Sequence, residues 1–144
     1  MQVPQSLRTW FIVHGVVDLA AAIPLLVAPD HALRAIGWTS VDPAASRLVG
    51  AALLAIGTQS LRVRNAGVEV YRPLLGLKVI WSLAAAAGLF AAIGAGAPPA
   101  TWAFLSIFIA FAGVWTHHAI RFRQLDRVES LEDGDPEPEP PPSE

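Results

Sequence analysis

The sequence of 144 residues contains no cysteine, which excludes disulfide bonds, thiolate metal ligands and a cysteine nucleophile. It also lacks a phosphate-binding glycine loop, a zinc-binding signature and the Ser-His-Asp pattern of hydrolases. Acidic residues are scarce over most of the chain: only Asp18, Asp30, Asp42 and Glu69 precede residue 126. These absences favour a protein that is not an enzyme, although they leave the question open.

Apolar residues are abundant instead. Of all residues, 53% are hydrophobic and 15% are charged, which is too apolar for an ordinary soluble domain of this size. Four windows, 7–28, 44–61, 73–94 and 99–120, are each near the roughly 20 apolar residues that a bilayer's hydrocarbon core requires. Pro43, Pro73 and Pro99 fall in the expected first helical turns, where a missing N–H costs nothing. We therefore predict an all-α integral membrane four-helix bundle over residues 1–127.

Basic residues are divided unequally between the two predicted sides of the membrane. The termini and the loop between the second and third spans carry seven arginines, whereas the opposite side carries Arg34 and Arg47. Positive charge concentrates on the cytoplasmic side, so we predict a multi-pass protein of the cell (inner) membrane with both termini in the cytoplasm. Because the arginines lie at the membrane boundary, we expect the lipid bilayer to be their partner and expect no nucleic acid binding.

Two segments outside the spans differ from them in length and composition. The stretch "HALRAIGW" is too short to cross a bilayer and predicts an interfacial turn of helix anchored by Trp38. Residues 128–144 are acidic and proline-rich. Such a segment buries too little apolar area to offset its ordering entropy, so we predict a disordered cytoplasmic tail.

The spacing of polar residues predicts which face of each span turns inward. His14 and Asp18 are four residues apart and therefore share one face of the first span. The same sorting aligns Arg47 with Thr58 in the second span, and it places Lys78 on the small-residue face of the third. Because ionisable groups avoid lipid, we predict that these faces meet in a partly polar bundle interior.

The fourth span offers two opposite stripes, one aromatic and one made of small residues and a histidine. Their members are Phe104, Phe108, Phe111 and Trp115 in the first, and Ser106, Ala110, Gly113 and His117 in the second. Large aromatic rings can face lipid tails, and small residues allow neighbouring helices to approach. We therefore predict that the aromatic stripe faces lipid and that His117 points into the bundle, while His118 reaches the cytoplasmic interface.

The candidate binding or proton-handling residues are thus His14, Asp18, Lys78, His117, Arg47 and Thr58. An isolated carboxylate near the middle of a span costs at least about 2.5–3.5 kcal/mol. Asp18 therefore needs a proton, His14, Lys78 or a reach from Arg47 to neutralise it. No catalytic residue, metal site or cofactor is predicted, except that His14 and His117 on facing helices form an alternative haem-ligand pair.

Two stretches, "PLLVAPDHALRAIGW" and "SRLVGAALLAIGTQSLRVR", resemble small four-span bacterial membrane proteins of the DoxX-like group, many of which are uncharacterised. The resemblance covers about residues 7–122. It implies a four-helix membrane fold and no defined activity, and it assigns no catalytic residue.

Three functions follow from these patterns. The first is a non-enzymatic membrane component, either an accessory or scaffold subunit or a binder of a small lipophilic molecule. The alternative is a small transporter or proton-coupled permease that uses Asp18, His14 and Lys78. The third is a haem- or quinone-linked redox membrane protein. Membrane protein partners or a homo-oligomer fit the first two, because one four-helix bundle leaves little room for a transport path.

Overall fold

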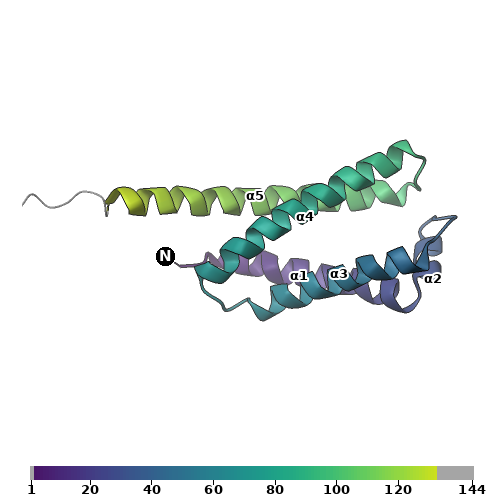
Figure 1. Ribbon diagram of the computed structural model, residues 1–144, viewed down its shortest axis with the longest axis horizontal. Helices are drawn as coiled ribbons and strands as arrows, with labels where there is room; N and C mark the ends of the chain where they lie inside the picture. The colour runs from purple at the N-terminus through teal and green to yellow at the C-terminus, as the bar shows by residue number, and fades with distance from the viewer. Residues whose placement is uncertain (1, 133–144) are drawn as a thin grey trace, which may run out of the picture.

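The computed structural model describes residues 2–132 of the chain and the side chains of residues 2–125. Within that part the chain forms helices and loops but no strand (Figure 1), which confirms the predicted all-α class. The five helices, in chain order, are α1 (Gln5–Val27), α2 (Pro29–Ala35), α3 (Pro43–Arg62), α4 (Val68–Gly94) and α5 (Ala100–Glu132).

Four of these helices are long and apolar enough to cross a membrane: α1, α3, α4 and the Ala100–Leu125 part of α5. Their main difference from prediction is that α4 starts at Val68, so Pro73 lies inside the helix instead of in its first turn. The additional turn buries Val68 and Tyr71, and the Tyr71 ring lies 4.5 Å from that of Phe11, centroid to centroid. This burial offsets the backbone hydrogen bond that Pro73 cannot make.

At the other end of the chain, α5 continues to Glu132. Residues 128–132, for which the composition predicts disorder, are therefore helical. They are mostly good helix formers, whereas the first glycine and the first proline of the tail, Gly134 and Pro136, come later. The rest of the predicted disordered tail falls on residues 133–144, outside the described part of the chain.

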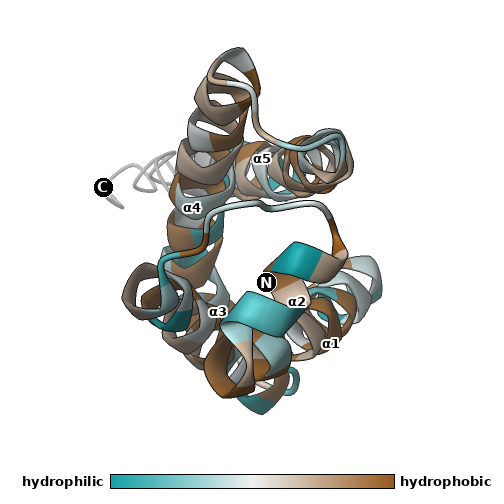
Figure 2. Ribbon diagram, turned by 90° about the vertical axis from the view of Figure 1, so that its right-hand side faces the viewer, coloured by the Kyte–Doolittle hydropathy of each residue, from teal (hydrophilic) through white to brown (hydrophobic). Residues whose placement is uncertain are grey.

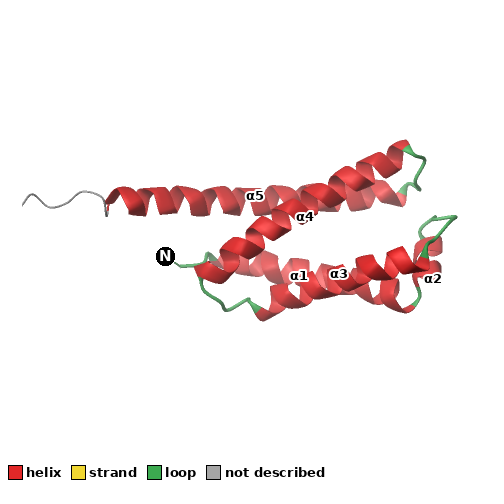
Figure 3. Cartoon of the chain, in the orientation of Figure 1, coloured by secondary structure: helices red, strands yellow, loops and turns green. Residues whose placement is uncertain are grey.

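Local signals set the helix ends. The Asp42 side chain caps α3, since its Oδ1 accepts hydrogen bonds from the N–H groups of Ala44 (2.8 Å) and Ala45 (3.1 Å). Gly37 and Gly96 follow α2 and α4 with φ angles of 103° and 85°, a conformation that closes helix ends and favours glycine. Short loops then return α3 alongside α1 and α5 alongside α4 (Figure 3).

The long helices form two pairs: α1 packs against α3, and α4 packs against α5, while α2 contacts α1 and α3. We call these pairs the α1–α3 hairpin and the α4–α5 hairpin. In two perpendicular views, α4 begins beside the α1–α3 hairpin and rises away from it towards its carboxyl end (Figures 1 and 2). The molecule is thus two hairpins that meet near the start of α1, rather than four evenly packed helices.

Glycines set the close approach within the α1–α3 hairpin. A Cβ added at Gly57 would lie 2.7 Å from the Asp18 Cβ and 3.0 Å from the Gly15 carbonyl oxygen. One added at Gly15 would lie 2.9 Å from the Gly57 carbonyl oxygen. No larger residue fits at either position without moving a backbone, which is how small residues join helices inside a bilayer.

The apolar core lies where the two hairpins meet. It contains buried residues from the amino-terminal parts of α1 and α4, Val63 at the end of α3, and aromatic residues of α5. Its members are Val3, Leu7, Phe11, Val63, Val68, Tyr71, Leu75, Phe111, Trp115 and Phe122.

Candidate functional site

Four polar side chains from three helices are buried beside this core. Their exposed fractions are 1% for His14 and 5% for Asp18 on α1, 1% for Ser60 on α3, and 2% for Lys78 on α4. The prediction that His14, Asp18 and Lys78 face the interior is therefore confirmed. We call these four residues the polar cluster.

Lys78 connects the two hairpins through this cluster. Its Nζ donates a hydrogen bond to the Ser60 Oγ at 2.8 Å and lies 3.1 Å from the His14 Nδ1. The Ser60 hydroxyl in turn donates to the carbonyl oxygen of Ile56 at 2.7 Å. A lysine of α4 is thus held by side chains of both α1 and α3.

His14 stands between the lysine and the aspartate. Its Nδ1 lies 2.8 Å from the Asp18 Oδ2 as well as 3.1 Å from the Lys78 Nζ. Among the described residues, Asp18 makes no direct ion pair with Lys78. Of the neutralising partners expected for Asp18, the histidine is therefore the one in contact.

The His14 Nδ1 cannot hydrogen-bond to Asp18 and to Lys78 at the same time. With a proton, Nδ1 donates to the Asp18 carboxylate; without one, it accepts from the Lys78 ammonium. The Asp18 Oδ2 and the Lys78 Nζ both lie within hydrogen-bonding distance of Nδ1, at 2.8 Å and 3.1 Å, so the protonation of Nδ1 decides which of them is bonded. Moving a proton within the cluster exchanges the two arrangements.

Aromatic rings complete the surroundings of the lysine. The Lys78 Nζ lies 4.8 Å from the centroid of the Phe11 ring and 5.0 Å from that of Trp115, within the range of cation–π attraction. His14 packs edge-on against Phe111 and Trp115, with centroid distances of 4.5 Å and 5.2 Å. The ammonium group is therefore held by a hydroxyl, an imidazole and two ring faces.

The predicted orientation of α5 is wrong. Phe111 and Trp115, expected to face lipid, are buried against the cluster, whereas Gly113 and His117, expected inside, are exposed. His118, expected at the interface, is buried. Helical spacing groups residues onto one face but does not say which of two apolar faces turns inward. Here the aromatic face turns inward, with Trp115 near the Lys78 ammonium and Phe111 against His14.

The predicted inward face of α3 is displaced as well. Thr58 is exposed, and the buried residues of this helix are Gly50, Leu53, Gly57 and Ser60. Sequence reasoning missed Ser60, the hydroxyl that contacts Lys78. Its signal in the sequence is the spacing of small residues at 50, 57 and 60, which continues the glycine face by one turn.

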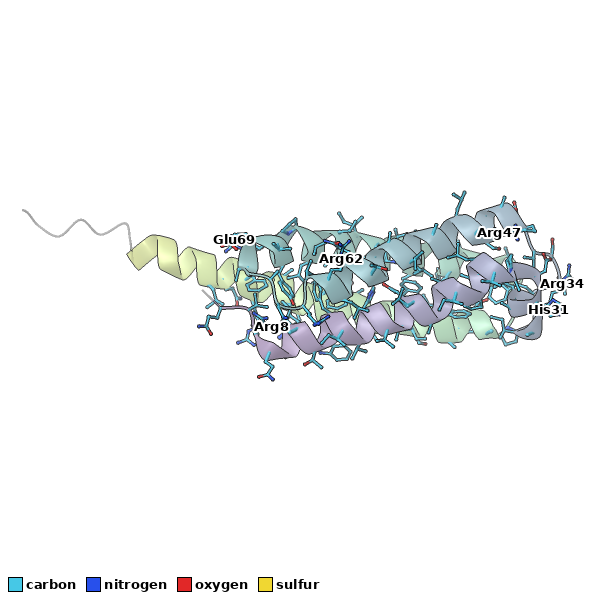
Figure 4. The ribbon with its side chains drawn as sticks, turned by 90° about the horizontal axis from the view of Figure 1, so that it is seen from below. Arg8, His31, Arg34, Arg47, Arg62 and Glu69 are labelled. Atoms are coloured by element: carbon cyan, nitrogen blue, oxygen red, sulfur yellow. The ribbon has the colours of Figure 1, made fainter. Side chains whose placement is uncertain are left out.

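Arg47 does not reach Asp18. Its side chain is exposed, and its Nε donates to the carbonyl oxygen of Leu26 at 3.3 Å, near the end of α1. Figure 4 shows it at the end of the molecule opposite Arg8 and Glu69. This position suits a structural role at a helix end.

The structure does not assemble the proposed haem ligands. His14 is buried in the polar cluster, but His117 is exposed and its ring contacts that of His118, at a centroid distance of 5.4 Å. Among the side chains that the structure describes, residues 2–125, no three His, Asp or Glu groups converge as metal ligands would. The two histidines therefore do not fit a bis-histidine haem site.

Comparisons with protein-family models, with curated proteins and with solved structures find no match. The resemblance to the DoxX-like group stays a prediction. Functional inference therefore depends on the polar cluster and on the way the two hairpins surround it.

Proposed function

We propose that this chain is a non-enzymatic multi-pass component of the cell (inner) membrane, with both termini in the cytoplasm. In this role it is an accessory or scaffold subunit, or it binds a small lipophilic molecule. The observation that carries the proposal is that Lys78 contacts side chains on α1, α3 and α5. One side chain of α4 thus joins all four long helices.

Breaking the contacts of Lys78 inside a membrane would cost considerable free energy. Interhelical hydrogen bonds average about 0.6 kcal/mol there, but an uncompensated buried charge costs at least about 2.5–3.5 kcal/mol. Lys78, His14 and Asp18 therefore favour one arrangement of the two hairpins over others. A fixed arrangement of helices is what a partner helix or a lipophilic ligand requires for specific binding.

The interior beyond the cluster is less completely covered. Along the same inward faces, Asp18 and Ser82 are buried, whereas Leu25 on α1 and Leu89 on α4, towards the α2 end, are only half-buried. This is the half in which α4 rises away from the α1–α3 hairpin (Figure 1). The half-covered apolar faces of the two hairpins suit a lipophilic molecule or a helix of a partner subunit.

The test is to purify the full chain from its own membranes in a mild detergent and to identify what accompanies it by native mass spectrometry. We expect either one lipophilic molecule or one membrane protein in stoichiometric amount. Leu89→Trp should displace it, because Leu89 lies on the half-covered face of α4. Phe90→Trp is the matched control, since Phe90 is the exposed next residue of the same helix. Purification with neither companion, or equal loss in both variants, contradicts the proposal.

A second candidate function, proton-coupled transport, is favoured by the position of His14 between Lys78 and Asp18. Loss or gain of one proton would exchange the bonding partner of Nδ1 and so alter the contact between the hairpins. In proteoliposomes, Asp18→Asn should then abolish a pH-dependent flux while assembly stays intact. Loss of the co-purifying partner without any flux in the wild type would instead support the accessory function.

A further inference from the structure

A second polar region lies next to the cluster along α1, towards the end of the molecule where α1 and α4 begin. An open cavity of about 730 Å³ is formed there by the start of α1 and the loop between α3 and α4. Its polar lining consists of two arginines, Arg8 and Arg64, and four neutral side chains, Gln2, Gln5, Thr9 and Asn65. No Asp or Glu belongs to this lining, so the cavity attracts anions.

The two arginines keep donors free for a ligand. The Arg8 Nη1 donates to the Arg64 carbonyl oxygen at 3.0 Å, and the Arg64 Nη1 donates to the Leu61 carbonyl oxygen at 3.3 Å. A guanidinium carries five N–H donors, so each arginine retains several. Planar groups of donors of this kind bind phosphate oxygens in pairs.

Two helix amino ends add to the positive potential. Pro4 and Gly67, which precede α1 and α4, both line the cavity, and neither provides a side-chain cap for its helix. The unpaired N–H groups of a first turn carry partial positive charge. The carboxylate closest to this end of α4 is Glu69, whose Oε2 lies against Gly67 and weakens the attraction.

The rest of the lining is apolar. Val3, Ile12 and Val68 line the cavity too, and Ile12 is an exposed residue of α1. If α1 and α4 cross the membrane, as the proposed function requires, their first turns lie at the depth of the lipid headgroups. The cavity then offers arginines at headgroup level and an apolar wall towards the acyl chains.

From this combination we propose that the cavity binds an anionic phospholipid, with the phosphate held by Arg8 and Arg64 and an acyl chain along Ile12. A free phosphate ion shares the charge but does not use the apolar wall. The inference rests on the membrane location in the proposed function, and it does not involve the polar cluster.

In the experiment, the full chain in dodecyl maltoside is titrated with phosphatidylglycerol or with phosphatidylcholine. Native mass spectrometry measures how much of each lipid binds. Phosphatidylglycerol should bind at least about fivefold more tightly, and Arg64→Gln should weaken it by about fivefold. Arg34→Gln is the control, because Arg34 is an exposed arginine on the opposite end of the molecule (Figure 4). Glu69→Gln should tighten binding, which a variant that merely damages the fold would not do.

Three results would overturn the proposal: equal affinity for the two lipids, an equal effect of Arg34→Gln and Arg64→Gln, or displacement of phosphatidylglycerol by millimolar inorganic phosphate. The last result would identify a site for free phosphate. Membrane insertion is measured separately, by resistance to carbonate extraction. An inserted chain without lipid preference would therefore remove the headgroup site and leave the proposed function standing.

Discussion

The two hairpins of this protein differ in how closely a neighbouring backbone approaches their glycines. In the α1–α3 hairpin, Gly15 and Gly57 allow the backbones to approach so closely that an added Cβ at either position meets a carbonyl oxygen within 3.0 Å. In the α4–α5 hairpin, an added Cβ at Gly76, Gly88 or Gly113 meets nothing within 4 Å. A small residue in a membrane helix is thus a packing device only where a neighbouring backbone faces it.

The α4–α5 hairpin instead contributes large aromatic residues to its contact with α1. The Phe111 and Trp115 rings are parallel within 3° at a centroid distance of 5.8 Å, and they face His14 and the Lys78 ammonium of the cluster. The α1–α3 hairpin therefore provides close backbone contact, and the α4–α5 hairpin provides the cation and the rings around it. The comparison predicts that equivalent substitutions in the two hairpins have unequal effects.

The largest effect is expected at the residue that joins the hairpins. Lys78→Met removes the cation, leaves the buried Asp18 without a compensating charge, and should lower the free energy of unfolding by about 3 kcal/mol. Thermal unfolding in detergent measures this loss. Asp18→Asn added to Lys78→Met should restore part of the stability, and Leu77→Met, at an exposed neighbouring position, should change little. A double variant less stable than Lys78→Met would rule out this account of the cluster.

A smaller effect is expected for glycine substitutions, and only in one hairpin. Gly57→Ala should destabilise by about 1–3 kcal/mol, because the new methyl group would force the α1 and α3 backbones apart. Gly88→Ala should be neutral or slightly stabilising, since its site is open and alanine is the better helix former. The same unfolding measurement compares them. Equal destabilisation would show that α4 packs on a neighbour through Gly88.

The smallest effect is expected from trimming a ring beside the lysine. Trp115→Phe weakens the cation–π contact with Lys78 and should cost about 1 kcal/mol. Trp102→Phe, at an exposed position near the start of the same helix, should leave the unfolding temperature unchanged. Should Trp102→Phe prove the more harmful variant, the aromatic face of α5 would be turned towards lipid after all.

Much of the fold could be predicted from the sequence. The lengths of the apolar windows predict four long helices, and the four-residue spacing of His14 and Asp18 places both on the buried face of α1. Lys78 and Ser82 likewise share the buried face of α4. These inferences succeed because a charged or strongly polar residue in an apolar helix has only one energetically acceptable direction, towards the interior.

The orientations of α3 and α5 could not be predicted in the same way. A serine or threonine in a helix can satisfy its hydroxyl with its own backbone: the Ser106 Oγ donates to the Trp102 carbonyl oxygen at 2.9 Å and Ser106 is exposed. Hydroxyl groups therefore do not mark the inward face. Thr58, which helical spacing aligns with Arg47, and Ser106, on the small-residue stripe of α5, are accordingly both exposed.

The sequence by itself determined that this chain forms long apolar helices and that a histidine, an aspartate and a lysine turn towards the interior. Only the tertiary structure decided that these three meet a serine and a pair of aromatic rings where two hairpins join. The reason is that hydropathy separates polar from apolar residues, but in a membrane the interior and the surroundings are both apolar. Which apolar face packs inward then depends on the shapes and charges of the neighbouring helices.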